Sequence, residues 1–265
     1  MSGNSVAVFD PTIGQVEKFI PIGSEPNALA LSDDGQWLWV VNSGAKSIRA
    51  LDLTHDTVGP AFSVAMEPSG VTRIAVLPGS HDSLLMISGS WVSVYDNGIA
   101  RPNSATMAAS LITTTQSPLL AYAFNDESSS WDLTRLCVNG NGVFAQQIVQ
   151  QAFGGNGGNL SFYDGFLYGG SAVYDASKQS LVAQLPIRGS HSLDPANRRI
   201  FLLDQNAIHA VDMDTFVQLG TEYFSATSKY RPSFTRWGRY GFAFVGAPNH
   251  FDAGTLYIGL SRLIP

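Results

Sequence analysis

A short strand that ends in aspartate and runs into a tight turn recurs along this 265-residue chain. Successive aspartates are separated by 42, 44, 79 and 37 residues, and the long interval holds one further copy that ends in asparagine. A period of roughly 40 to 45 residues in a sequence of short strands is typical of a β-propeller. The copies are Val6–Asp10, Ile48–Asp52, Val92–Asp96, Leu136–Asn139, Ala172–Asp175 and His209–Asp212.

A second kind of hairpin lies between these copies, in which an apolar strand, a polar turn and an aromatic-rich strand follow one another. The clearest example is Ala28–Val41, because its Asp33-Asp34-Gly35 segment is a strong turn signal between two alternating runs. Together with the aspartate-ended strand and its successor, each such hairpin predicts a four-stranded antiparallel blade. The five other hairpins lie in residues 74–88, 111–124, 160–168, 191–203 and 234–245.

The order of these strands leaves the number of blades open. The chain begins with an outer pair of strands, continues with five complete sets of four, and ends with a set of three whose last strand is Thr255–Leu260. This pattern is compatible with six or seven blades. We therefore expect one all-β propeller domain over residues 1–265 with an incomplete first blade. We also expect this domain to be a fragment of a longer chain.

Composition narrows the classes of partner. The net charge is -6 with 15 Lys and Arg residues that form no basic cluster, so we expect no nucleic-acid partner. No apolar run is long enough to cross a bilayer, which predicts no membrane insertion. Cys137 is the single cysteine and excludes a disulfide within the chain. Residues 1–6 show no export signal, and we expect a monomer.

Several segments resemble known propeller repeats. Residues 6–16 and 23–40 are similar to the YVTN-type repeat of bacterial and archaeal surface-layer and secreted propellers, with Trp39-Val-Val-Asn42 in place of the signature tetrapeptide. Residues 94–102 and 236–244 resemble blades of secreted bacterial seven-bladed propellers. The resemblance implies seven blades, which we prefer to six, and an extracellular or cell-surface location.

The recurrent aspartates could be taken for a row of catalytic carboxylates. Each one stands at the end of a strand, where its side chain can accept backbone N–H groups two residues further on in an Asx-turn. Repetition in successive blades also favours a structural role. The close pair Asp212 and Asp214 lacks the spacing of a calcium loop, and we expect neither a metal site nor a cofactor.

The candidate ligand-binding residues lie where inner strands begin. In propellers these loops converge on the mouth of the central channel, so that several blades can each supply one polar group. Among the five histidines, His191 is the most informative because it leads into an inner strand. The candidates are Glu25, Asn27, Asn159, His191 and Arg231.

Two functions are compatible with these observations. The first is a non-enzymatic binding or scaffolding module of a secreted or cell-surface bacterial protein, with a protein or carbohydrate partner. The alternative is a lactonase-type hydrolase, which would need an acid or base opposite an Arg or His at the channel mouth. The chain offers Glu25, His191 and Arg231 for that role. We prefer the binding module because of the family resemblance and because the sequence contains no catalytic constellation, nucleophile motifs included.

Overall fold

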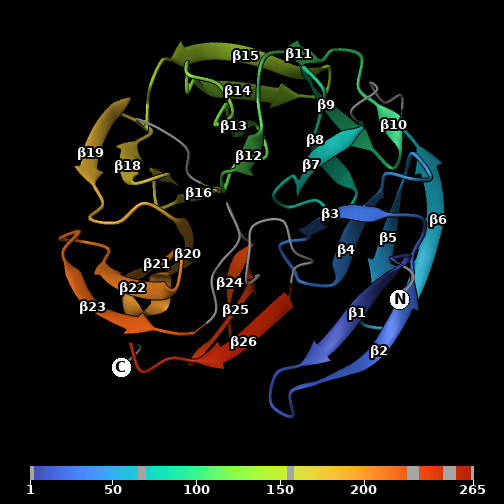
Figure 1. Ribbon diagram of the computed structural model, residues 1–265. Coiled ribbons are helices and arrows are strands. Elements are labelled where there is room, and N and C mark those ends of the chain that lie inside the picture. The colour runs from blue at the N-terminus through green and yellow to red at the C-terminus, as the bar shows by residue number, and fades with distance from the viewer. Residues whose placement is uncertain (1–2, 65–69, 154–157, 226–232, 247–254, 264–265) are drawn as a thin grey trace. The chain divides into compact units, whose positions relative to one another are not determined.

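The computed structural model of the protein describes residues 3–64, 70–153, 158–225, 233–246 and 255–263. This part of the chain consists of β-strands and one short 3-10 helix. It divides into two compact units, unit 1 (Met1–Gln150) and unit 2 (Gln151–Pro265). Figure 1 labels the strands in chain order, from blue at the N-terminus to red at the C-terminus.

The described part of unit 1 forms four antiparallel sheets, in which strands that are neighbours in the sequence pair with each other, apart from β11, which pairs with β9 (Figure 1). The first two sheets are formed by β1 (Ser5–Asp10) and β2 (Gln15–Pro21), and by β3 (Pro26–Leu31), β4 (Trp37–Asn42), β5 (Ser47–Asp52) and β6 (Thr57–Ser63). The third contains β7 (Val71–Val76), β8 (Ser83–Ser88), β9 (Trp91–Asp96), β10 (Ile99–Ala100) and β11 (Ala105–Thr106), and the fourth β12 (Leu111–Thr114), β13 (Leu120–Phe124), β14 (Leu133–Asn139) and β15 (Gly142–Val149).

Unit 2 continues the same pattern with three antiparallel sheets in its described part. The first contains β16 (Leu160–Tyr163), β17 (Phe166–Gly169), β18 (Ala172–Asp175) and β19 (Ser180–Gln184). The second contains β20 (Ser190–Asp194), β21 (Arg199–Asp204), β22 (Ala207–Asp212) and β23 (Gln218–Tyr223), and the 3-10 helix η1 (Pro195–Asn197) connects its first two strands. The third contains β24 (Phe234–Trp237), β25 (Gly241–Gly246) and β26 (Thr255–Leu260).

The structure corrects the expected number of blades. Among the described residues, six sheets contain three or more strands, whereas β1 and β2 pair only with each other. A pair of strands is not a four-stranded blade, so six blades are better supported than the seven that the resemblance implied. The predicted order of strands is confirmed, including the three-stranded last set that ends with Thr255–Leu260.

The core lies between the faces of neighbouring sheets. Alternate residues of a strand point to opposite faces, so a strand with a sheet on each side must be apolar throughout. In β8, Leu84 and Met86 pack toward the sheet β3–β6, while Leu85 and Ile87 pack toward the sheet β12–β15. Strand β21 of unit 2 divides its side chains between two apolar clusters in the same way. This two-sided burial explains the unbroken apolar runs in the second strands of the hairpins.

The aspartates of the aspartate-ended strands accept hydrogen bonds from the turn that follows, as predicted. The backbone N–H of Thr12 donates to Asp10 Oδ1 at 2.7 Å, and equivalent bonds of 2.8–3.0 Å reach Asp52, Asp175 and Asp212. The pKa of all four carboxyls is lowered, chiefly by the Thr12 hydroxyl for Asp10 and the His55 side chain for Asp52, and by the N–H groups of Lys178 and Thr215 for Asp175 and Asp212. The exception is Asp96, which ends β9 before the two-residue turn Asn97-Gly98.

Gly142, at the start of β15, lies against the backbone of the preceding sheet. Asn103 N–H donates to the carbonyl of Asn141 at 2.9 Å, and Val143 N–H donates to the carbonyl of Asn103 at 3.2 Å. Gly142 has a φ of 132°, and a Cβ atom there would stand 2.0 Å from the carbonyl oxygen of Asn103. Glycine is therefore required at this position by both conformation and space.

We predict that Gly142→Ala lowers the free energy of unfolding by about 3 kcal/mol, because the methyl group meets a backbone atom that cannot rotate away. Urea unfolding followed by circular dichroism measures the change. Gly140→Ala is the matched control, since a Cβ atom at Gly140 meets nothing within 4 Å; its stability should stay unchanged or rise by up to about 1 kcal/mol. Equal stabilities of the two variants would contradict the close approach of the sheets.

Candidate functional site

The predicted site residues are distributed over both units. Glu25 immediately precedes β3, and Asn27 is the second residue of that strand in unit 1. Asn159 precedes β16, and His191 is the second residue of β20 in unit 2. Arg231 lies outside the described residues. Each described candidate thus stands near the start of the first strand of a sheet, as the sequence predicts.

Asn27 and Asn159 use their side-chain amides to join neighbouring sheets. Asn27 Nδ2 donates to the carbonyl of Val71 in β7 at 3.0 Å. Asn159 Nδ2 donates to the carbonyl of His191 at 2.8 Å, and its Oδ1 accepts the N–H of His191 at 2.9 Å. The first strand of one sheet is therefore linked to the backbone of the next sheet's first strand. Asn27 Nδ2 and both polar atoms of the Asn159 amide are thus engaged in bonds between sheets.

Glu25 is exposed and is held by its backbone. It has a left-handed φ of 53°, and its carbonyl accepts both the N–H of Ser43 at 3.0 Å and the Ser43 hydroxyl at 2.9 Å. Gly44 leaves room for the carboxylate, since a Cβ atom at that position would stand 3.1 Å from Glu25 Oε2. Of the described candidates, Glu25 is the one whose charged group is on the surface.

His191 is buried and has an internal partner. Its Nε2 lies 2.9 Å from the Ser161 hydroxyl, and its ring centroid lies 6.4 Å from that of Tyr168. The side chain is 2% exposed, and burial lowers the pKa of the imidazole to about 4 and raises that of Tyr168 to about 12. His191 and Asn159 are brought together, but as residues bonded to each other: Asn159 immediately precedes β16, and His191 lies in β20 of the next sheet.

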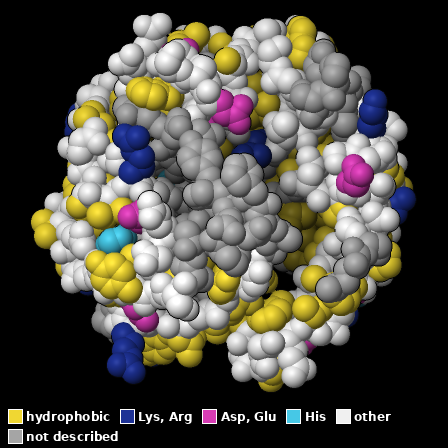
Figure 2. Space-filling model, viewed as in Figure 1, with side chains coloured by type: hydrophobic (Ala, Val, Ile, Leu, Met, Phe, Trp, Pro, Cys, Tyr) yellow, Lys and Arg dark blue, Asp and Glu magenta, His cyan; other side chains and the backbone are white. Residues whose placement is uncertain are grey.

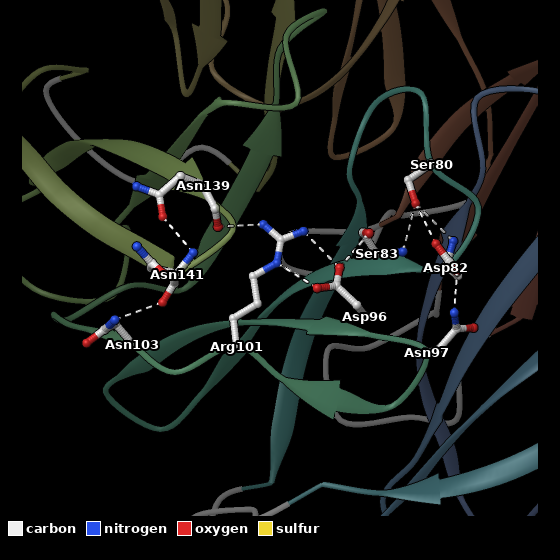
Figure 3. A network of polar contacts seen from close by, with 9 residues as sticks. All are labelled: Ser80, Asp82, Ser83, Asp96, Asn97, Arg101, Asn103, Asn139 and Asn141. Atoms are coloured by element: carbon white, nitrogen blue, oxygen red, sulfur yellow. Dashed lines mark hydrogen bonds and ion pairs between the residues drawn. The ribbon is translucent and has the colours of Figure 1, made fainter.

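Asp96 belongs to a polar network between two sheets of unit 1. The Arg101 guanidinium donates to both carboxylate oxygens of Asp96, at 2.7 and 2.8 Å, and to the Asn139 carbonyl at 2.8 Å. Figure 3 shows Arg101 lying between these two partners. The Ser83 hydroxyl also donates to Asp96 at 2.6 Å, and these contacts, led by the one with Arg101, lower the carboxyl pKa. Arg101, held by Asp96, therefore joins the sheet β7–β11 to the sheet β12–β15.

A second ion pair, which the sequence reasoning missed, joins two sheets in unit 2. Arg236 of β24 contacts the carboxylate of Asp194 at the end of β20, and both side chains are largely buried. The guanidinium also lies over the rings of Phe201 and Phe242, with its central carbon 5.1 and 5.9 Å from their centroids. Removing one partner of such a buried ion pair strongly destabilises a protein, because the other charge is left buried without a partner. It is a structural link and does not provide a free charge.

A surface pocket in unit 1 was also missed by the sequence reasoning. It has a volume of about 280 Å³ and is lined by the alternate residues Trp91, Ser93 and Tyr95 of β9, with Ser104 beside them. The available signal was this Trp-x-Ser-x-Tyr alternation, in which polar and aromatic side chains occupy one face of a strand. None of the described residues that line the pocket is charged. The pocket can therefore offer hydroxyl groups and an aromatic surface.

Charged side chains are scattered over the face of the molecule that Figure 2 shows. In the described part of the face shown in Figure 2, Lys, Arg, Asp and Glu side chains occur singly among uncharged ones. Among the described residues, no group of three or more His, Cys, Asp or Glu side chains could hold a metal ion. In the same part of the chain, no helix has the length and hydropathy of a membrane span.

Comparison with known proteins shows the fold. No protein-family model and no curated protein matches the chain. Hydrazine synthase of Kuenenia stuttgartiensis aligns with a TM-score of 0.70 and 13% identity over 98% of this chain and 90% of its own. The Cps50 (Swd1) β-propeller domain of Myceliophteria thermophila aligns with a TM-score of 0.67 and 11% identity over 92% and 87%. The predicted all-β propeller with four-stranded antiparallel blades is thus confirmed.

The buried imidazole of His191 makes the stability of the protein depend on pH. Its pKa is about 4 in the folded state and 6.5 when solvated, so between these values the unfolded chain binds a proton that the folded chain does not. The contribution of the neutral His191 side chain to the free energy of unfolding is complete above pH 6.5 and is lost as the pH falls to 4. We predict that it amounts to about 3 kcal/mol, measured by urea unfolding at pH 7.5 and pH 4.

His191→Gln should reduce this loss of stability on acidification. It should not abolish the loss, because burial lowers the pKa of His209 as well. His81→Gln is the control, since His81 is exposed at the surface, and its pH dependence should match that of the wild type. The interpretation of His191 as a buried neutral group is wrong if both variants respond to pH as the wild type does.

Proposed function

We propose that this chain is a non-enzymatic binding module of a secreted or cell-surface bacterial protein. The surface pocket lined by Trp91, Ser93, Tyr95 and Ser104, which we call the Trp91 pocket, carries this proposal. It presents an exposed ring and hydroxyl groups, and its described lining contains no carboxylate, amine or imidazole. Such a surface can hold a ligand by contact and hydrogen bonds without supplying an acid or a base. The surface location rests on the resemblance to YVTN-type repeats, and protease treatment of intact cells tests it.

The contacts of His191 also favour this proposal over a lactonase. A general base must reach the proton that it removes. The imidazole of His191 is 2% exposed and faces Ser161, and burial holds its pKa near 4. A hydrolase that used His191 would have to expose this side chain and break its links to the neighbouring strand.

A hydrolysis assay distinguishes the two functions. A panel of γ- and δ-lactones is incubated with the wild type, with His191→Gln and with Glu25→Gln, and ring opening is followed by proton release. We expect the wild type to open no lactone faster than buffer does. A saturable rate in the wild type that either substitution lowers by tenfold or more would overturn the binding proposal in favour of a hydrolase.

A further inference from the structure

We propose that the Trp91 pocket binds a neutral saccharide, with the indole ring as a platform for one sugar ring. This inference rests on the proposed binding function and specifies its ligand. The pocket lies on the face of β9 that is turned toward the sheet β3–β6. Three of its lining residues, Tyr95, Met86 and Val64, belong to the apolar cluster between the sheets β3–β6 and β7–β11. The intervening residues of β9 pack on the opposite face.

Trp91 is exposed but firmly placed. Its side chain is 42% exposed, yet its backbone pairs with Ser88 of β8 on one side and with Thr106 of β11 on the other. A residue within a sheet has little freedom to lose when a ligand binds. The face of an indole ring carries a partial negative charge, which attracts the weakly positive C–H groups on the flat side of a sugar ring.

Hydroxyl groups lie next to this ring. The side-chain oxygens of Ser93 and Ser104 are 2.8 Å apart and share one hydrogen bond. Since each hydroxyl has one proton and two lone pairs, the accepting serine keeps its own proton, and lone pairs are left on both oxygens. The pair can thus donate to one sugar hydroxyl and accept from another. Apolar side chains of a protein partner would make no use of these groups.

The size and charge of the pocket narrow the ligand class further. A volume of about 280 Å³ lies just below the range of about 300–1,000 Å³ for ligand sites, which suits one or two sugar rings. The floor of the pocket is apolar: Met86 and Tyr95 are buried, and Tyr95 stacks on Phe62 with centroids 6.2 Å apart. With no charged side chain in the described lining, the site favours a neutral sugar over a phosphorylated or carboxylated one.

Saturation-transfer NMR tests this proposal on the full chain. The probes are methyl glycosides of glucose, galactose and mannose, with methyl glucuronide as the charged comparison. We expect saturable binding of at least one neutral glycoside and weaker binding of the glucuronide. Trp91→Ala should weaken that binding by about tenfold or more, and the double variant Ser93→Ala/Ser104→Ala by about threefold to tenfold.

Phe19→Ala is the matched control, because Phe19 is an exposed aromatic residue on β2; its affinity should stay within about twofold of the wild type. Thermal unfolding verifies that the variants are folded. The proposal is overturned if no neutral glycoside binds, if Trp91→Ala binds as the wild type does, or if the serine substitutions leave affinity unchanged. That last result would indicate that the glycoside makes no use of the serine hydroxyl groups.

The same spectra separate the two proposals. Absence of glycoside binding overturns the saccharide site but leaves a binding module for a protein partner. Cleavage of a glycosidic bond during the experiment would appear as free sugar signals and would overturn the non-enzymatic function. The saccharide site would then still be decided by the response of Trp91→Ala.

Discussion

Apolar side chains pack between the faces of neighbouring sheets, and the other features of each unit depend on this packing. The middle strands are buried on both faces, so their side chains are fully used by the core, as Leu84 and Leu85 of β8 illustrate. Polar groups that could bind a ligand are thereby restricted to strand ends, turns and the outer part of a sheet face. The candidate residues and the Trp91 pocket lie in such places.

Polar links complete the packing at the strand ends. An amide, an imidazole or an ion pair in one sheet contacts the backbone or a side chain of the next, as Asn159, His191 and Arg236 do. A buried polar group without a hydrogen-bond partner lowers the stability of the fold. These bonds therefore fix which groups of neighbouring sheets meet, as the surrounding apolar contacts do. Two of the residues that the sequence nominates for ligand binding, Asn159 and His191, thus make contacts between neighbouring sheets.

The sequence was sufficient to predict the strands and turns because these depend on local chemistry. The aspartate-ended strands end where expected, and Asp10 caps its turn through residues two positions away. The contacts of His191 could not be predicted, because Ser161 is 30 residues distant and meets it only when two sheets stack. The number of blades was misjudged for a related reason: it depends on which sheets reach full width, which no single repeat specifies.

The central claim is that candidate residues such as Asn159 stabilise the contact between sheets and are not held ready for a ligand. The free energies of unfolding of Asn159→Ala and Glu25→Ala test it directly. We predict that Asn159→Ala loses about 1–3 kcal/mol, because the N–H and C=O groups of His191 lose their partners, and that Glu25→Ala changes by less than about 0.5 kcal/mol. An Asn159→Ala variant as stable as the wild type would contradict this account.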